Sequence, residues 1–171
     1  MPLFYYGCYM LKYVCFEVLG VPVAKGRAKV ANRGKFSTVY SPKKTVDAER
    51  SILSQALPHK LPDMPWEGAL RIDIILIFPR PKSHYGTGKN INVLKEDAPK
   101  YHISRPDSSN ILKLTEDSLN GIFFKDDSQI CEVNVIKIYG EIAKQIITIS
   151  KITNKYNSYP ETSSYSIWGE K

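Results

Sequence analysis

The chain has 171 residues, of which 43% are hydrophobic and 24% are charged, a composition that excludes collagen-like, membrane-embedded and disordered proteins. Its length suits one domain that buries a sizeable core. Lys and Arg total 24 against 17 Asp and Glu, which gives a net charge of +7, and such an excess favours a polyanionic partner such as a nucleic acid.

The positive charge is concentrated in the first third of the sequence. Residues 1–62 contain ten basic but only three acidic residues, whereas residues 101–150 contain five basic and seven acidic residues. A protein that binds and cuts nucleic acid needs a cationic surface for phosphates and carboxylates for a metal ion. The sequence supplies both features and keeps them apart.

Residues 1–10 are interpreted as an N-terminal extension, with Met10 as an alternative start, because the patterned sequence begins just after it. The extension is too short for a membrane span and lacks the basic start of a signal peptide, so the cytoplasm is the expected compartment and no membrane partner is expected. Without CxxC spacing, the cysteines predict neither a disulfide framework nor a zinc site, and we expect them reduced and mostly buried. They are Cys8, Cys15 and Cys131.

Residues 12–30 alternate in polarity and predict a strand with a bend at Gly20. Near its end, basic residues recur at every second position with small residues between them, so an extended chain would present a cationic comb. A turn signal follows, and residues 36–40 can return as the second arm of a hairpin. We expect this hairpin to contact DNA phosphates rather than to be only a solvated basic surface. The candidate contacts are Lys25, Arg27, Lys29, Arg33 and Lys35.

The middle of the chain predicts a helix, a strand and a loop. Ser41 and Pro42 announce a helix that ends before Pro58. Residues 69–78 are apolar on both faces, which indicates a central strand with cover on each side. Residues 79–104 predict a long functional or mobile loop. Its GTGKN stretch lacks the first Gly and the final Ser or Thr of a phosphate-binding P-loop, so no nucleotide site is expected there.

Residues 105–130, RPDSSNILKLTEDSLNGIFFKDDSQI, hold the densest group of functional side chains. Residues 111–120 predict an amphipathic helix that is capped by Asp107 or Ser108 and ended by Gly121. An acidic turn follows, before a strand over residues 129–139. Because a helix of roughly 14 residues spans about 20 Å, carboxylates at its two ends meet only through a partner subunit or a return path of the chain. The polar face comprises Ser109, Asn110, Lys113, Glu116, Asp117 and Asn120.

This region resembles the RusA-type Holliday junction resolvases, small Mg²⁺-dependent endodeoxyribonucleases of phages and bacteria. The resemblance extends from Gly20 to about Ile149 and rests on GVPVAKGRAK, PRPKSHYGTGKN and above all PDxxNxxKxxxDxLNGxxxxDDSQI. It implies a compact mixed α/β (α+β) fold with two main helices, a homodimer without a small-molecule cofactor, and symmetric cleavage of four-way DNA junctions. The nuclease domain is expected over residues 11–152, followed by a tail, 153–171, whose polar composition predicts disorder.

The resemblance also implies roles for single residues. Asp107 would be the first metal-binding aspartate, Lys113 the active-site lysine and Asp127 the last catalytic aspartate. The second aspartate of the family falls on Ser109, whose hydroxyl brings no formal charge to Mg²⁺. We therefore expect Glu116, seven residues later on the same face, to supply the missing carboxylate. The candidate metal ligands are Asp107, Glu116, Asp117, Asp126 and Asp127, and Lys137 on the following strand is a further candidate DNA contact.

Lys113 stands four residues before Asp117, so it is expected to pair with this carboxylate at rest or to stabilise the pentacovalent phosphate. Two other nuclease classes do not fit. The PD-(D/E)xK class needs an acidic residue two positions before a lysine, which does not occur in this sequence, and the three histidines are too scattered for a ββα-metal site. The alternatives are a non-catalytic junction-binding protein with a degraded metal site, and a structural or RNA-binding domain. We predict an active nuclease, because the other acidic positions of the motif are retained.

Overall fold

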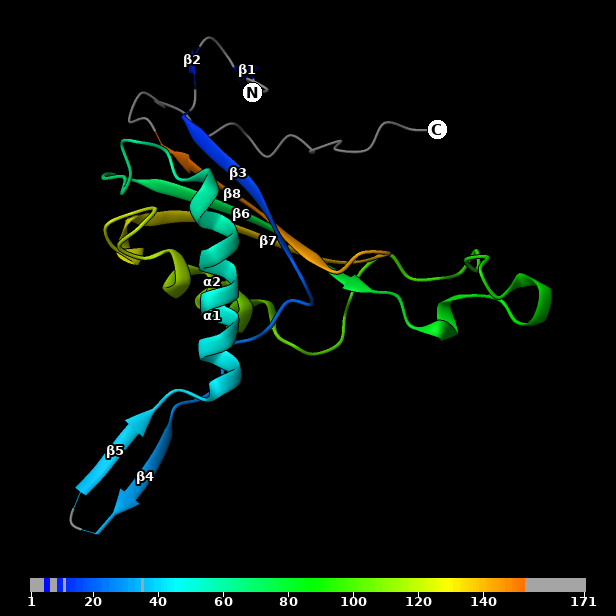
Figure 1. The fold of residues 1–171 in the computed structure, drawn as a ribbon. Coiled ribbons are helices and arrows are strands. Elements are labelled where there is room, and N and C mark those ends of the chain that lie inside the picture. The colour runs from blue at the N-terminus through cyan, green and yellow to red at the C-terminus, as the bar shows by residue number, and fades with distance from the viewer. Residues whose placement is uncertain (1–4, 7–8, 11, 35, 153–171) are drawn as a thin grey trace.

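The computed structural model describes residues 5–6, 9–10, 12–34 and 36–152. Its centre is a four-stranded mixed sheet of order β3-β8-β6-β7, with two helices in front of one face (Figure 1). The predicted mixed α+β fold with two main helices is therefore confirmed. The strands are β3 (Tyr13–Leu19), β6 (Leu70–Pro79), β7 (Ile130–Gly140) and β8 (Lys144–Lys151), and the helices are α1 (Lys43–Ala56) and α2 (Ser108–Leu119).

The central strand of the sheet is β6, as its apolar pattern predicts. It pairs in parallel with β7 and antiparallel with β8, and β8 pairs antiparallel with β3. Every second residue of β6 from Leu70 to Phe78 is buried, whereas the residues between them are partly exposed. The expectation of cover on both faces is therefore wrong for the described residues, since no described helix lies on the second face. Part of that face is polar, because Arg71 forms hydrogen bonds of 2.7 and 2.8 Å with Asp73.

The core lies between the sheet and the two helices. Both helices turn apolar stripes toward the buried side chains of β3, β6 and β8, and the turn after α2 adds two phenylalanines. The ring of Phe123 from this turn lies 5.4 Å from the ring of Phe16 on β3. Burial of this apolar surface holds α2 in place, so that its polar side remains available for chemistry. The helical and turn residues in the core are Ile52, Ala56, Ile111, Leu114, Leu119, Phe123 and Phe124.

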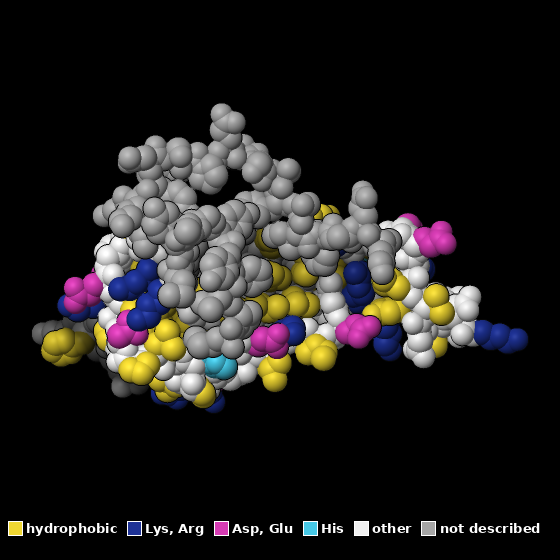
Figure 2. Space-filling view, turned by 90° about the horizontal axis from the view of Figure 1, so that it is seen from above, with side chains coloured by type: hydrophobic (Ala, Val, Ile, Leu, Met, Phe, Trp, Pro, Cys, Tyr) yellow, Lys and Arg dark blue, Asp and Glu magenta, His cyan; other side chains and the backbone are white. Residues whose placement is uncertain are grey.

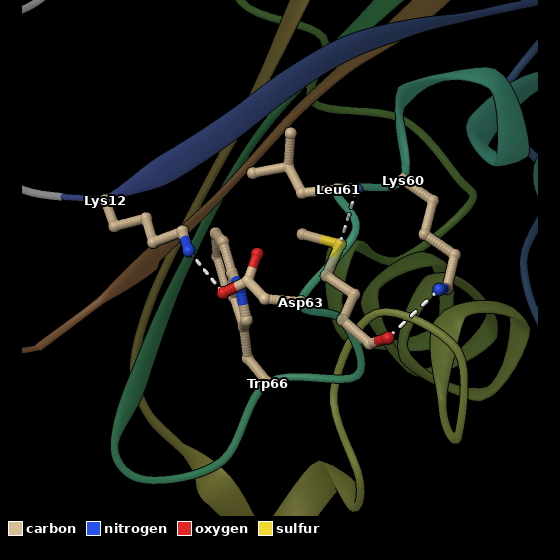
Figure 3. Close-up of polar contacts among 6 residues, drawn as sticks. Lys12, Lys60, Leu61, Asp63 and Trp66 are labelled. Carbon is tan, nitrogen blue, oxygen red and sulfur yellow. Dashed lines mark hydrogen bonds and ion pairs between the residues drawn. The ribbon is translucent and has the colours of Figure 1, made fainter.

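A loop after α1 and the short helix η1 (Leu57–His59) contacts the same turn. Figure 3 shows polar contacts within this loop and between it and Lys12. Trp66 is buried, and its indole Nε1 donates to Asp63 Oδ2 at 3.1 Å. The Lys12 ammonium forms an ion pair with Asp63, and this contact holds the pKa of the Asp63 carboxyl below its usual value. The Trp66 carbonyl accepts a hydrogen bond of 3.2 Å from the backbone N–H of Lys125, just before the acidic turn. The loop therefore fixes the position of that turn.

Two arms extend from the central domain (Figure 1). The first is the hairpin of β4 (Lys29–Arg33) and β5 (Phe36–Tyr40), which projects beyond the N-terminal end of α1. The second is the long segment after β6, predicted as a loop, which contains the short helices η2 (Lys82–His84) and η3 (Gly88–Asn90). Figure 2 shows hydrophobic side chains along this second arm and basic side chains at its far end. No helix among the described residues is long and apolar enough to cross a membrane.

The strand predicted over residues 12–30 is interrupted in the structure. β3 ends at Leu19, residues 21–28 are irregular, and extended pairing resumes only at Lys29. Gly20 adopts a φ of 114°, a conformation that a strand does not use, and Pro22 is buried and lacks a donor for a sheet ladder. The proposed cationic comb is therefore not a continuous strand.

Two expectations about the remaining segments are corrected or lie outside the described residues. Cys15 and Cys131 are free but exposed, so the prediction of mostly buried cysteines is wrong for these two, which lie on the edge strands β3 and β7. Cys8 lies outside the described residues, as does the tail 153–171. Within the N-terminal extension, β1 (Tyr5–Tyr6) pairs antiparallel with β2 (Tyr9–Met10).

Candidate active site

The polar face of α2 carries the predicted site residues. Lys113 is exposed, and Glu116 and Asp117 are half-buried one turn further on. The opposite side of the helix is buried, as its periodicity predicts. The polar residue Thr115 is also buried on this side, and its hydroxyl donates to the Ile111 carbonyl at 3.1 Å. The amphipathic pattern therefore places the candidate residues correctly on one face.

Glu116 lies among other carboxylates. Partial burial raises the pKa of its carboxyl, and the negative charges of Asp127 and then Asp117 raise it further, while the nearby Lys113 ammonium opposes them. The charges of Asp127 and Asp117 therefore act on the Glu116 carboxyl. Two residues from the polar face of α2 and one from the following turn thus form a region of concentrated negative charge.

Asp117 forms an ion pair with the ammonium group of Lys25. The expected pairing of Asp117 with Lys113 is therefore wrong, because the chain after β3 runs beside α2 and brings a different lysine. The backbone N–H of Lys25 also donates to the Asn110 carbonyl at 2.9 Å. Lys25, predicted as a DNA contact, thus holds the base of the hairpin against the acidic helix.

Asp107 is the N-cap residue of α2, and its side chain makes no capping hydrogen bond. The carboxylate is therefore not used to begin the helix. The loop that precedes it is held by Lys137, whose Nζ donates to the carbonyls of Ser104 and Pro106, each at 2.7 Å. Lys137 was predicted as a DNA contact, whereas the structure gives its ammonium group a structural role beside Asp107.

The two aspartates of the acidic turn differ in their contacts. Asp126 caps the short helix η4 (Asp127–Gln129), because its Oδ1 accepts a hydrogen bond of 3.0 Å from the N–H of Ser128. Hydrogen bonds from Ser128 lower the pKa of the Asp126 carboxyl. Gln129 completes the cap and donates to the carbonyls of Trp66 and Gly68. Asp127 is exposed and interacts with Glu116.

The candidate ligands form no complete metal cage within one chain. Asp107 lies at the N-terminal end of α2, whereas Asp127 acts on Glu116 in its C-terminal half. Among the described residues, no group of three or more His, Cys, Asp or Glu side chains is arranged to hold a metal ion. Mg²⁺, however, is often bound by one or two carboxylates together with waters and substrate phosphates. The converging charges of Glu116 and Asp127 fit this smaller requirement.

The basic residues predicted to bind DNA fall into three groups. Arg27 and Lys29 are exposed, at the base and at the start of the hairpin. Lys25 and Lys137 are engaged in the contacts above. Arg33 belongs to β4, but its side chain, like the whole of Lys35, lies outside the described part of the structure.

The positioning roles of Lys25, Lys137 and Gln129 cannot be predicted from the sequence. Each role depends on a contact between residues far apart in the chain, such as the 92 positions that separate Lys25 from Asp117. No periodicity of a single sequence carries this information. Only the Asp-Asp-Ser-Gln stretch contained a local signal, because an acidic residue followed three positions later by Gln is the pattern of a capping box.

The small mixed fold, the acidic helix and the basic hairpin together are typical of a nuclease that uses a metal ion. Residues 20–150 match the family model described as "Endodeoxyribonuclease RusA", and the chain belongs to this family of Holliday junction resolvases. A protein of Bacillus subtilis (strain 168) described as "Uncharacterized protein YqaN" is 30% identical over 141 residues, which cover 81% of this chain and 96% of that protein. RusA resolvases are generally dependent on a divalent metal ion.

Proposed function

We propose that this protein is a Mg²⁺-dependent endonuclease that resolves four-way DNA junctions by symmetric hydrolysis of phosphodiester bonds in recombination and repair. The observation that carries the proposal is the RusA-family match over residues 20–150, which includes the polar face of α2 with Glu116 and the turn with Asp127. Glu116 lies on the same helical face as Ser109, which stands where the family has its second aspartate. In this proposal Glu116, two turns further along α2, supplies the carboxylate that Ser109 lacks.

In this proposal each residue of the site has a distinct task. Glu116 and Asp127 hold Mg²⁺, with Asp117 beside them, and Asp107 contributes a further carboxylate from the N-terminal end of α2. The bound ion supplies the polarisation of a phosphate oxygen and lowers the pKa of a water molecule. Lys113, exposed on the same face, stabilises the negative charge that develops on the phosphate. Asp126 supports the turn through its cap rather than by binding metal.

We further propose that the active form is a homodimer. A four-way junction has two-fold symmetry, and two symmetric cuts need two sites related by the same symmetry. A second subunit also offers a route by which Asp107 and Asp127 from different chains meet. Sedimentation of the free protein and of its junction complex measures this stoichiometry, and one chain per junction would contradict it.

A second function is favoured by one observation. Ser109 replaces a charged ligand, and the described residues contain no group of three acidic side chains arranged around a metal. A protein of this kind would bind the junction without cutting it. This alternative keeps the basic hairpin as its binding surface and gives no role to Glu116.

Incubation of the purified protein with a synthetic four-way junction and Mg²⁺, beside a matched linear duplex, separates the two functions. The nuclease produces paired nicks in the junction and leaves the duplex intact. Asp107→Asn and Asp127→Asn should each remove the nicks while junction binding persists. Tight binding without nicks in the wild-type protein would contradict the nuclease and support the binding protein.

A further inference from the structure

The hairpin of β4 and β5 exposes an unusual amount of apolar surface. All five residues of β5 are exposed, and Phe36 and Tyr40 are 79% and 48% exposed. The base of the hairpin is held where the N–H of Gly26 donates to Thr45 Oγ1 at 3.0 Å, and its strands extend away from the sheet and helices (Figure 1). A stable fold has no use for exposed rings on such an arm, so they indicate an interaction surface.

The strand register sorts the hairpin residues into two faces. Tyr40 lies opposite Lys29, and Phe36 lies opposite the position of Arg33. Directly opposed residues in an antiparallel pair share one face, and pairs two positions apart share the same face. One face of the hairpin therefore carries an aromatic residue beside a basic position at each end. Between these two pairs stand the small residues Ala31 and Thr38.

The charge of this arm selects the partner. No acidic residue occurs between Glu17 and Asp47, so the hairpin and its base are purely cationic. Basic groups alone would suit the phosphates of any duplex, but exposed rings add nothing to such a contact. Aromatic rings beside cations are the means by which proteins bind nucleic acids whose bases are unstacked. The two rings stand four residues apart, about 13 Å along the strand, so each meets a separate base.

We propose that Phe36 and Tyr40 stack on bases that are unstacked where a DNA substrate branches, while Lys29 and its neighbours contact the adjoining phosphates. The proposal rests on the proposed function, because it names the part of the junction that the hairpin binds. It assigns the hairpin to recognition of DNA structure, which phosphate contacts alone do not provide.

The test compares Phe36→Ala, Phe36→Leu and Phe36→Trp with the wild type by fluorescence anisotropy on a four-way junction and on a fully paired duplex over a range of salt concentrations. Stacking predicts that Phe36→Ala weakens junction binding roughly 5- to 100-fold, changes duplex binding less than about twofold, and leaves the salt dependence unchanged. Phe36→Leu keeps apolar bulk but lacks a ring, so it should be as weak as Phe36→Ala. Phe36→Trp should bind as tightly as the wild type, with its fluorescence quenched by the junction.

Lys29→Gln is the matched control for a phosphate contact. It should weaken binding to both DNAs and reduce the slope of log Kd against log salt by about 0.9. All variants should keep the thermal midpoint of the wild type, because Phe36 and Lys29 are both exposed. If Phe36→Ala folds poorly, the comparison of Phe36→Leu with Phe36→Trp still distinguishes a stacked ring from a structural one.

Four results would overturn the inference. The first is wild-type junction binding by Phe36→Ala in a protein that cuts junctions, which leaves the proposed function intact. The second is full rescue by Phe36→Leu, which indicates simple apolar contact. The third is loss of a dimer in Phe36→Ala by sedimentation, and the fourth is Phe36-dependent binding to phosphatidylserine vesicles. A different pair of results would reject the proposed function and support stacking. In that case the wild type cuts no junction, and Phe36→Ala binds a single-stranded oligonucleotide more weakly than the wild type does.

Discussion

The ammonium group of Lys25 pairs with the carboxylate of Asp117, and this contact joins the base of the basic hairpin to the acidic face of α2. The hairpin and the candidate active site are therefore mechanically linked, although 92 positions separate the two residues in the sequence. In the proposed function, DNA bound along the hairpin would therefore be directed toward the carboxylates of α2.

Replacing Lys25 tests this link. Lys25→Met should lower the free energy of unfolding by about 1 kcal/mol, because it leaves the half-buried Asp117 carboxylate without its partner. Loss of the Lys25 charge leaves the Asp117 carboxylate uncompensated, so the variant should also bind the junction more weakly. Urea unfolding and anisotropy measure the two effects. Arg27→Met, at an exposed neighbouring position, is the control and should change the stability by less than about 0.5 kcal/mol; equal stability of the two variants would rule out the link.

Lys137 separates a structural from a DNA-binding role. The structure predicts that Lys137→Met costs about 1 to 2 kcal/mol of stability, because two hydrogen bonds of 2.7 Å from a charged donor are lost beside Asp107. Cleavage should fall as the loop before Asp107 loosens, whereas the salt dependence of DNA binding should stay unchanged. A salt slope reduced by about one, with wild-type stability, would instead establish Lys137 as a phosphate contact. Lys89→Met, at an exposed position on the second arm, is the control and should keep the stability of the wild type.

Restoring the acidic residue at position 109 should raise activity. Ser109 is exposed in the first turn of α2, where a carboxylate also interacts favourably with the helix dipole by about 0.3 to 1 kcal/mol. Ser109→Asp should therefore gain a little stability and cut junctions at least as fast as the wild type. Ser108→Asp, one residue earlier in the same turn, controls for the dipole effect. Faster cleavage by both variants, or slower cleavage by Ser109→Asp, would show that position 109 is not a ligand position.

His102 predicts part of the pH dependence of stability. Its ring stacks on Phe78 with centroids 3.9 Å apart, and within the described residues its buried Nδ1 has no hydrogen-bond partner. Burial, and then the charge of Lys137, lower the pKa of His102 below its usual value of 6.5. The unfolded chain therefore binds a proton more readily than the folded protein does. As a result, the free energy of unfolding decreases as the pH falls below 6.5.

His102→Phe keeps the stacked ring but removes the titrating group. Between pH 7 and pH 5, the variant should lose less stability than the wild type, as measured by the urea midpoint at each pH. The other titratable groups are the same in both proteins, so the difference between the two pH profiles reports on His102. Parallel losses in the two proteins would show that His102 does not contribute.

The sequence was sufficient for features that depend on local patterns. The two helices, the central strand β6 and the polar face of α2 follow from periodicity, Pro and Gly signals and capping, and their residues match the structure closely. The order of the motif also predicts the site residues, and their roles stay predictions. The pairing of Asp117 failed, because a helical spacing of four residues favours Lys113 until a distant segment supplies a better partner. The prediction that both faces of the sheet are covered was wrong for a similar reason, because the sequence of an isoleucine-rich strand does not reveal whether a helix covers each face.

The measurement that tests the account most directly is the Mg²⁺ dependence of junction cleavage by Glu116→Gln. Gln keeps the shape of Glu116 but removes the charge that we assign to the metal. We predict that the half-saturating Mg²⁺ concentration rises at least about tenfold, equivalent to about 1.4 kcal/mol, with junction affinity unchanged, whereas Glu141→Gln, an exposed carboxylate elsewhere, behaves as the wild type. Identical Mg²⁺ titrations for Glu116→Gln and the wild type would contradict the account, because Glu116 would then not replace the aspartate missing at Ser109.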